Sequence, residues 1–260
     1  MSDPEFKGAS DYDRTTYGTW DISMQRIEDM AAKDGDKALA AQSAIRILRI
    51  FAFLDPANIP QELFKNAAEN YVKRDDKKDS SKFSFFIRAK SKCPLSIRLL
   101  DHETLFLSGK GVWEKMKSLT GIQVLISLSF IEAHGQLYSM HILVHAWNRN
   151  KIPKAEATIL CQKARALLSC SVDLDYRIDN YAFCKLLAGH VRNNALHASE
   201  LELKRTCCED EYERFTLVFH HVGNWDEVEK LLLETLRVRT TVLGMNHPKT
   251  LWSMSQLAAT

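Results

Sequence analysis

The chain contains 260 residues, with 35 lysines and arginines against 33 aspartates and glutamates, and its formal net charge is +2. This near balance excludes a global electrostatic attraction to nucleic acid or to a membrane, and no stretch approaches the roughly 18 consecutive apolar residues of a transmembrane helix. The six cysteines include no Cys-x-x-Cys pair, which favours free thiols in a reducing compartment. We therefore expect a cytoplasmic protein without metal or cofactor.

The N-terminal segment predicts a helical lead-in to a larger domain. Residues 1–10 contain no secretory signal and are expected to be disordered or to derive from an expression vector. Residues 11–36 include a short helix that carries Ile22, Ile27 and Met30 on its apolar side.

Residues 37–150 predict a winged-helix domain. Its helix through Leu54 is apolar on almost every side, which is typical of a central buried helix. An Asp-Pro pair ends this helix, and Pro60 is expected to open the next one. Residues 73–92 contain eight basic residues against three aspartates, so they predict a solvated insertion within the domain.

A two-stranded β wing is predicted near the end of this domain. A helix around residues 119–128 passes into a strand at Ser129–Ala133, and the return strand is expected at Leu137–His141. The intervening His-Gly-Gln triplet suits a hairpin turn. The chain then enters another helix that contains Trp147.

The remainder of the chain predicts helices throughout. Residues 151–208 form linker helices, one starting near Pro153 and another near Asp179. Residues 209–243 predict a helix–turn–helix hairpin whose second helix has an apolar stripe. The predicted fold is therefore mostly α: a winged-helix domain with a small β wing, a helical linker and the start of an α-solenoid at residues 209–260.

Turn and cap residues define the ends of this last hairpin. Asn224 is a candidate N-cap for the second helix. Gly244 suits a left-handed cap just past its end, and Pro248 is expected to open the next helix.

Two corners of this segment resemble those of a tetratricopeptide array of the kinesin-light-chain type. They are Gly223-Asn224-Trp225-Asp226 and Leu243-Gly244-Met245-Asn246-His247-Pro248-Lys249-Thr250-Leu251. The resemblance implies about one and a half repeats. Because solenoid repeats bury their apolar faces against neighbours, and about three are needed for an independent stack, such a short array is expected to leave an apolar face unpaired.

Four further motifs occur in order along the chain: Tyr17–Ser23, Leu48–Leu54, Met140–Trp147 and Leu186–Val191. Together with the repeat, they are similar to the middle of NB-ARC–tetratricopeptide proteins, which are nucleotide-dependent regulators of the STAND class abundant in filamentous fungi. The similarity covers residues 12–260. It implies the winged-helix, linker and first tetratricopeptide portions of such a regulator.

The chain lacks the loop with which such regulators hold a nucleotide. That loop needs Gly-x-x-x-x-Gly-Lys-Ser/Thr, because backbone amides and one lysine must cradle the phosphates. Gly109-Lys110-Gly111 has the wrong spacing. We therefore expect no nucleotide to bind to this chain alone.

In the related regulators, a Met-His-Asp motif of the winged helix places its histidine on bound ADP. Met140 and His141 match its first two positions, but Ile142 stands where aspartate is expected. One charge-assisted hydrogen bond contributes about 1.5–3 kcal/mol, whereas even a millimolar complex needs about 4 kcal/mol. His141 is therefore expected to sense a nucleotide only with a separate nucleotide-binding domain, and otherwise to pack where the wing meets the helix.

No pattern in the sequence predicts catalysis or metal binding. His141 and His145 are four residues apart and are expected to share one helix face, but no glutamate follows His141 and no third ligand is evident. No Gly-x-Ser-x-Gly elbow places a nucleophile. An enzyme is therefore not expected.

Two hypotheses from different classes remain. The first is a non-catalytic protein-interaction and regulatory module derived from a STAND NTPase, which binds a protein partner or a second copy, or a nucleotide-binding domain outside this chain. The alternative is DNA binding through the winged helix, although the candidate recognition helix at residues 120–128 contains no arginine or lysine. The first hypothesis predicts an interaction face formed by Val228, Leu231, Leu232, Leu236, Leu251, Met254 and Leu257.

Overall fold

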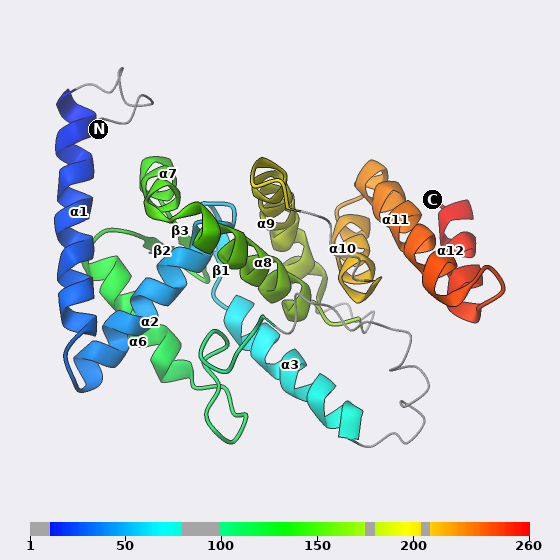
Figure 1. Cartoon of the computed structure of the whole chain (residues 1–260), viewed down its shortest axis with the longest axis horizontal. Coiled ribbons are helices and arrows are strands. Elements are labelled where there is room, and N and C mark those ends of the chain that lie inside the picture. The colour runs from blue at the N-terminus through cyan, green and yellow to red at the C-terminus, as the bar shows by residue number, and fades with distance from the viewer. Residues whose placement is uncertain (1–10, 80–98, 175–179, 204–208) are drawn as a thin grey trace.

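The computed structural model describes residues 11–79, 99–174, 180–203 and 209–260, and it is mostly helical with one small antiparallel sheet. Helix α1 lies at one end of the long axis of the molecule and α12 at the other, and α8 to α12 follow one another between its middle and the second end (Figure 1). The elements are α1 (Asp11–Ala31), α2 (Asp36–Phe51), β1 (Ile59–Pro60), α3 (Leu63–Asp79), α6 (Lys115–Ser127), β2 (Glu132–His134), β3 (Leu137–Ser139), α7 (Ile142–Lys151), α8 (Lys154–Ser171), α9 (Asn180–Glu200), α10 (Glu209–His221), α11 (Trp225–Leu243) and α12 (Pro248–Ala258).

Helix α2 is the centre of the first half of the molecule, as its composition predicts. It packs against α1, α6, α7 and α8, and its residues from Ile47 to Phe51 lie largely in the core. The helix is not buried on every side, since Leu39 in its first half has 52% of its surface exposed. The helix ends at Phe51 rather than at Leu54, but Phe53 and Leu54 stay fully buried in the turn that follows.

Helices α2 and α6 approach each other closely at Gly121. A Cβ atom at this position would lie 2.8 Å from the Cβ atom of Ser43 and 2.9 Å from its carbonyl carbon. Only glycine fits such an approach without a shift of one helix, since it has no Cβ atom. Gly121 therefore sets the distance between these two helices.

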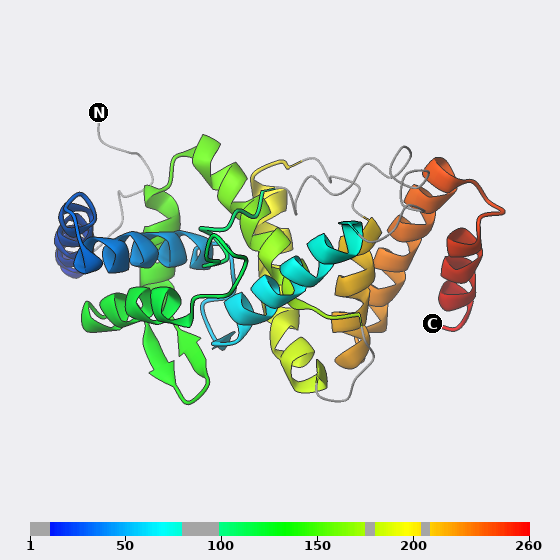
Figure 2. The same cartoon turned by 90° about the horizontal axis from the view of Figure 1, so that it is seen from below.

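The predicted β wing belongs to a three-stranded sheet with the order β1-β3-β2. In it, Glu132 lies opposite Ser139 and Ile59 lies opposite Tyr138. Figure 2 shows the β2–β3 hairpin projecting beyond the helices. The expectation that Pro60 opens a helix is wrong: Pro60 lies in β1 and α3 begins at Leu63. A proline is tolerated in β1 because this strand lies at the edge of the sheet.

The first strand of the wing is shorter than the predicted segment Ser129–Ala133. Ser129 has a positive φ of 56°, and this left-handed residue redirects the chain after α6. Phe130 and Ile131 then enter the core, so pairing begins only at Glu132. The predicted return strand also stops short, because it ends at Ser139 and His141 is already the N-cap residue of α7.

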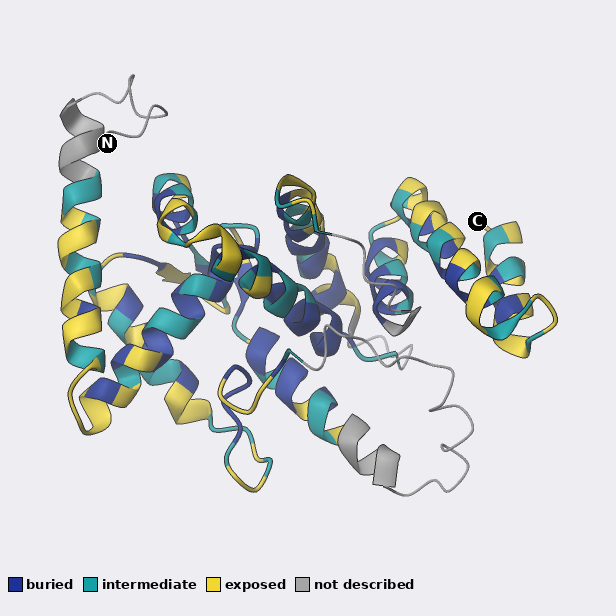
Figure 3. Cartoon of the chain, in the orientation of Figure 1, coloured by how far each residue is buried: buried dark blue, intermediate teal, exposed yellow. Residues whose placement is uncertain are grey.

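The predicted linker packs directly on the first domain. Helix α8 lies against α2 and α3, and α9 lies against α8 and β1. One continuous hydrophobic core extends from Ile27 to Leu232 (Figure 3). Residues 73–79 of the predicted insertion continue α3, whereas residues 80–92, Asp179 and residues 1–10 lie outside the described residues.

The C-terminal helices confirm the roles predicted for Asn224 and Pro248. The Asn224 side chain accepts a hydrogen bond from the Glu227 amide at 3.2 Å, and Pro248 is the first residue of α12. At Gly244 the expected left-handed cap is wrong: φ is positive at 92°, but ψ is 162°, which is extended rather than left-handed helical. Helix α10 packs against α11, and α11 packs against α12.

Candidate functional site

His141 lies exposed at the N-terminus of α7, where its Nδ1 atom accepts a hydrogen bond from the Leu143 amide at 3.2 Å. The first amides of a helix have no partner within the helix, and an N-cap side chain supplies one. The expectation that His141 packs where the wing meets the helix is therefore wrong, because capping holds the side chain at the surface.

His145 is buried one turn further along α7, and it does not share a surface with His141. Its Nε2 atom lies 3.0 Å from the Leu54 carbonyl oxygen. Burial lowers the pKa of His145 to about 4, and the Arg149 charge and the neighbouring His197 ring act in the same direction. In the part of the chain that the structure describes, no group of three or more His, Cys, Asp or Glu residues could hold a metal ion.

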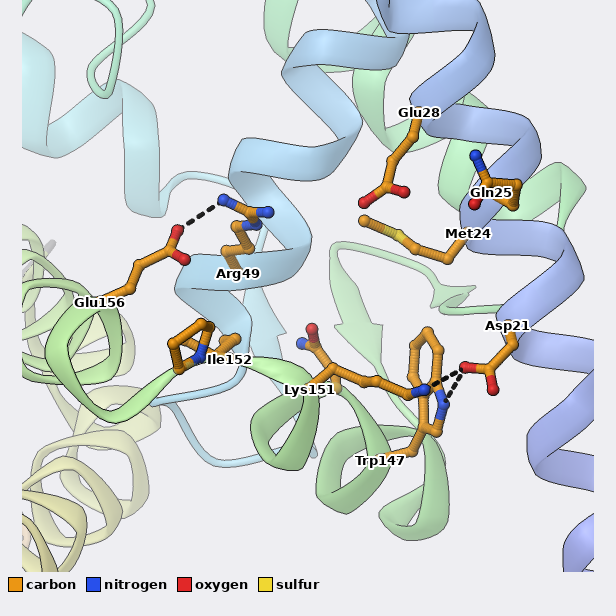
Figure 4. A pocket seen from close by; sticks show the side chains of 11 residues that line it. Asp21, Met24, Gln25, Glu28, Arg49, Trp147, Lys151, Ile152 and Glu156 are labelled. Carbon is orange, nitrogen blue, oxygen red and sulfur yellow. Dashed lines mark hydrogen bonds and ion pairs between the residues drawn. The ribbon is translucent and has the colours of Figure 1, made fainter. Parts of the chain in front are cut away.

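A polar groove of about 280 Å³ lies between α1, α2, α7 and the start of α8 (Figure 4). On one side, Asp21 accepts hydrogen bonds from the Trp147 indole at 3.0 Å and from Lys151 at 2.9 Å. On the other side, Arg49 forms an ion pair with Glu156 at 2.5 Å. The groove thus brings together two of the motifs named in the sequence analysis, Tyr17–Ser23 and Met140–Trp147.

A second groove of about 350 Å³ adjoins the first and shares Arg49 and Glu156 with it. Its other basic residues are also paired, Arg46 with Glu103 at 2.8 Å and Lys163 with Asp101 at 3.0 Å. A phosphate group entering either groove would have to displace a carboxylate from its partner. These ion pairs join helices and loops of the fold, and the grooves are poor candidates for an anion site.

The helix proposed to read DNA offers few groups for that purpose. Helix α6 packs against α2 through Gly121, Ile122 and Leu125, and its opposite side exposes Gln123 and Ile126. Lys117 in its first turn forms an ion pair with Glu114. One exposed glutamine is a small contribution to base recognition, which usually relies on several arginine, asparagine or glutamine side chains.

The predicted interaction face at the C-terminus divides into three levels of burial. Val228 and Leu232 are buried, with 2% and 6% of their surface exposed. The expectation that they form a free surface is wrong, because α10 and α12 pack against α11 and cover them within the chain. Leu231, Leu236, Met254 and Leu257 are half-buried, and Leu251 is 52% exposed.

A different set of apolar side chains forms the exposed surface of these helices. This surface, called here the C-terminal apolar surface, includes residues of α11, α12 and the turn between them. Of its members, the predicted face contains only Leu251, because Leu233 lies outside the apolar stripe of α11 and Met245 lies in the turn. Its members are Leu233, Val242, Met245, Leu251 and Trp252, each at least 40% exposed.

A small apolar cleft of about 80 Å³ lies where α10, α11 and α12 meet. Val228 and Leu232 contribute to its wall from α11, His220 from α10, and Trp252 and Gln256 from α12. The cleft is too small for more than one side chain, since ligand pockets usually measure about 300–1,000 Å³. It is suited to an anchoring side chain from another protein chain.

Arg239 fixes α12 beside this cleft, although nothing in the apolar pattern pointed to it. Only 1% of this arginine is exposed. One guanidinium nitrogen lies 2.5 Å from the Ser253 hydroxyl and 3.2 Å from the Lys249 carbonyl oxygen, and the other lies 3.4 Å from Glu213. The guanidinium also lies 5.6 Å from the centre of the Trp252 ring. Arg239 therefore joins α10, α11 and α12 through polar contacts.

Comparison of the chain with protein-family models, with curated proteins and with solved structures found no match. No helix within the described ranges has the length and apolar character needed to cross a membrane.

Proposed function

We propose that this chain is a non-catalytic protein-interaction module that binds another protein chain through the C-terminal apolar surface. The observation that carries this proposal is the exposure of large apolar side chains on two adjacent helices, beside a cleft that fits one side chain. Exposed apolar patches on folded proteins commonly mark interaction sites. The partner is a second copy of the chain or a different protein.

The arrangement of elements supports a winged-helix unit followed by the start of a tetratricopeptide-like solenoid. The helices α2, α3 and α6 precede a projecting β hairpin, in the order expected of a winged helix. The helices α10 and α11 pair, and α12 then packs on α11 as the next repeat would. This arrangement accords with the proposed derivation from a STAND-type regulator.

Within such a regulator, the chain would act as a relay and a scaffold. His141 is exposed at the start of α7, so a separate nucleotide-binding domain could reach it. Among the described residues, Cys161, Cys170 and Cys184 are buried and form no disulfide, which accords with a cytoplasmic location.

The mass of the chain in solution, measured by light scattering over a range of concentrations, tests the self-association form of this proposal. We expect the mass to rise with concentration in the native chain, and the double variant Met245→Glu with Leu251→Glu to remain monomeric. Ile22→Glu is the matched control, because Ile22 is an apolar residue of α1 with 73% exposure. A mass that rises equally in both variants would place the contact elsewhere, and a native chain that stays monomeric would exclude a second copy as the partner.

A further inference from the structure

Helix α9 packs on α8 through apolar side chains, and a row of its polar side chains binds the backbone of one turn, residues 53–58. Asn194 donates to the Phe53 carbonyl at 3.2 Å, and Asn193 donates to the Leu54 carbonyl at 2.8 Å. His190 accepts from the Asp55 amide at Nδ1, at 3.1 Å, and its Nε2 atom lies 3.2 Å from the Asn58 carbonyl oxygen. Four contacts, at Phe53, Leu54, Asp55 and Asn58, therefore connect α9 to the turn after α2.

The contact at His190 requires a neutral imidazole. Its Nδ1 atom must keep a lone pair to accept from the Asp55 amide, so the ring proton is on Nε2 and is donated to Asn58. The fit is also close, since a Cβ atom on Gly189 would lie 3.3 Å from the Asp55 carboxylate. A second proton on His190 would remove the acceptor and place two N–H groups against each other.

His197, in the last turn of α9, makes a second contact that requires a neutral imidazole. Its ring lies 6.1 Å from the Phe53 ring, edge to face. Its Nδ1 atom donates to Glu200 at 3.0 Å, which leaves Nε2 to accept from Arg149 of α7 at 2.9 Å. Arginine is always protonated, so His197 is also held in its neutral form.

Burial lowers the pKa of both histidines below the ordinary value. For His190, the Asn58 carbonyl and the Asp55 carboxylate oppose this effect. For His197, the hydrogen bond to Glu200 opposes it and the Arg149 charge reinforces it. The other groups facing this contact are His145 of α7, whose ring lies 6.0 Å from His197, and the Cys161 thiol of α8, which lies against Asn194.

From this geometry we infer that α9 and the 53–58 turn form a proton-sensitive joint, at which protonation of His190 and His197 breaks these polar contacts and loosens α9 against the first half of the molecule. The joint links the two halves that the proposed relay would have to couple, but the inference does not depend on any partner of the C-terminal apolar surface.

The direction of the pH effect follows from the protonation state of the closed joint. Because the folded pKa values are lowered, the contact is fully stable above the ordinary histidine pKa of about 6.5 and loses stability as the pH falls below it. At pH 5.5, an exposed histidine is about ten-to-one protonated. Opening that exposes one such residue therefore becomes favoured by up to about tenfold, and opening that exposes both by up to about a hundredfold.

Hydrogen exchange of the whole chain, followed by mass spectrometry at pH 7.5 and pH 5.5 and corrected for the intrinsic effect of pH, tests the joint. In the native chain, segments 53–58 and 183–200 should lose protection at pH 5.5, by up to about a hundredfold, while α2 keeps its protection. The double variant His190→Gln with His197→Gln should lose this response, because glutamine keeps a donor and an acceptor but does not titrate. His134→Gln is the control, since this histidine lies on β2, outside the joint, and its side chain is 65% exposed.

Two results would overturn the inference. A parallel loss of protection in α2 would show that acid unfolds the whole chain. An undiminished response in the double variant would show that other groups take up the protons. If the double variant does not fold at pH 7.5, the single variant His197→Gln serves in its place: it should lose up to tenfold of the response, and a response equal to that of the native chain would again contradict the joint.

Discussion

The two ends of the molecule are held together by different kinds of contact. Around α2, the packing is apolar, with residues such as Phe51, Ile47 and Phe130 almost fully buried. In α11 and α12, the polar residues Arg239, Thr250 and Ser253 are buried beside a smaller apolar set that includes Val228, Leu232 and Val238. An apolar core distributes its stability over many weak contacts, whereas a polar contact depends on each donor having its acceptor. The C-terminal end should therefore be the part that a single substitution can detach.

The largest effect is expected from removing a ring of the apolar core. Phe51 is 1% exposed and stacks on Phe64 with ring centres 6.3 Å apart. Phe51→Ala should lower the free energy of unfolding by about 3–5 kcal/mol, because it removes buried surface and leaves a cavity. Urea denaturation followed by circular dichroism measures this change. Leu39→Ala on the exposed side of the same helix is the control, with an expected change within about 0.5 kcal/mol.

The polar end of the comparison is tested at Arg239. Arg239→Ala should cost about 2–3 kcal/mol, less than a fully buried pair, because Glu213 is 29% exposed and water can solvate it. Hydrogen exchange should show the loss in α12 while α2 is unaffected. Arg237→Ala is a matched control, since Arg237 is 62% exposed and its ion pair with Glu234 is worth less than about 1 kcal/mol. Equal effects of the two substitutions would contradict the role assigned to Arg239.

Sequence patterns could predict the helices but not the side-chain pairs that join them. The apolar composition of α2 and the cap residues Asn224 and Pro248 were sufficient because they act over one or two helical turns. Strand β1 was missed because two residues with a proline give no alternating pattern. The burial of Val228 and Leu232 could not be predicted from the local sequence pattern either, because it depends on the packing of α10 and α12 against α11.

The candidate sites were harder still to predict. Arg239 pairs with Glu213 across 26 positions, and Asn194 binds Phe53 across 141 positions. Contacts over such separations leave no periodic signal in a single sequence. One signal was present: Asn194 lies on the same face of α9 as the apolar residues Leu187 and Val191, and a polar side chain on a buried face needs hydrogen-bond partners.

The close approach of α2 and α6 at Gly121 gives a second test of the apolar end. Gly121→Ala should destabilise the chain by about 1–2 kcal/mol, because the backbone of Ser43 must move to admit a methyl group and the gain in helix propensity offsets only part of this cost. Gly18→Ala is the matched control in α1, where no atom lies within 4 Å of the added methyl group. This second substitution should stabilise the chain by about 0.5–1 kcal/mol. If both substitutions destabilise the chain, the cost at Gly121 cannot be assigned to the steric clash with Ser43.

The smallest effects are expected from removing the histidine N-caps of α7 and α12, one in each half of the molecule. His141 caps α7 and His247 caps α12 in the same way, each accepting a hydrogen bond at Nδ1 from the amide two residues ahead at 3.2 Å. Replacing either histidine by alanine should cost about 0.5–1 kcal/mol of helix stability, and serine should restore it. Because α7 is built into the core through Trp147 and Val144, the cost of His141→Ala should appear in the urea midpoint of the whole chain.

The cost of His247→Ala should instead remain local to α12. This helix buries Thr250 and Ser253 and is attached mainly to α11, so its ends can open without unfolding the core. Hydrogen exchange in α12 should rise severalfold while the urea midpoint is unchanged. A lowered midpoint in both variants would mean that α12 unfolds together with the apolar half, and the two ends of the molecule would then be one cooperative unit despite their different packing.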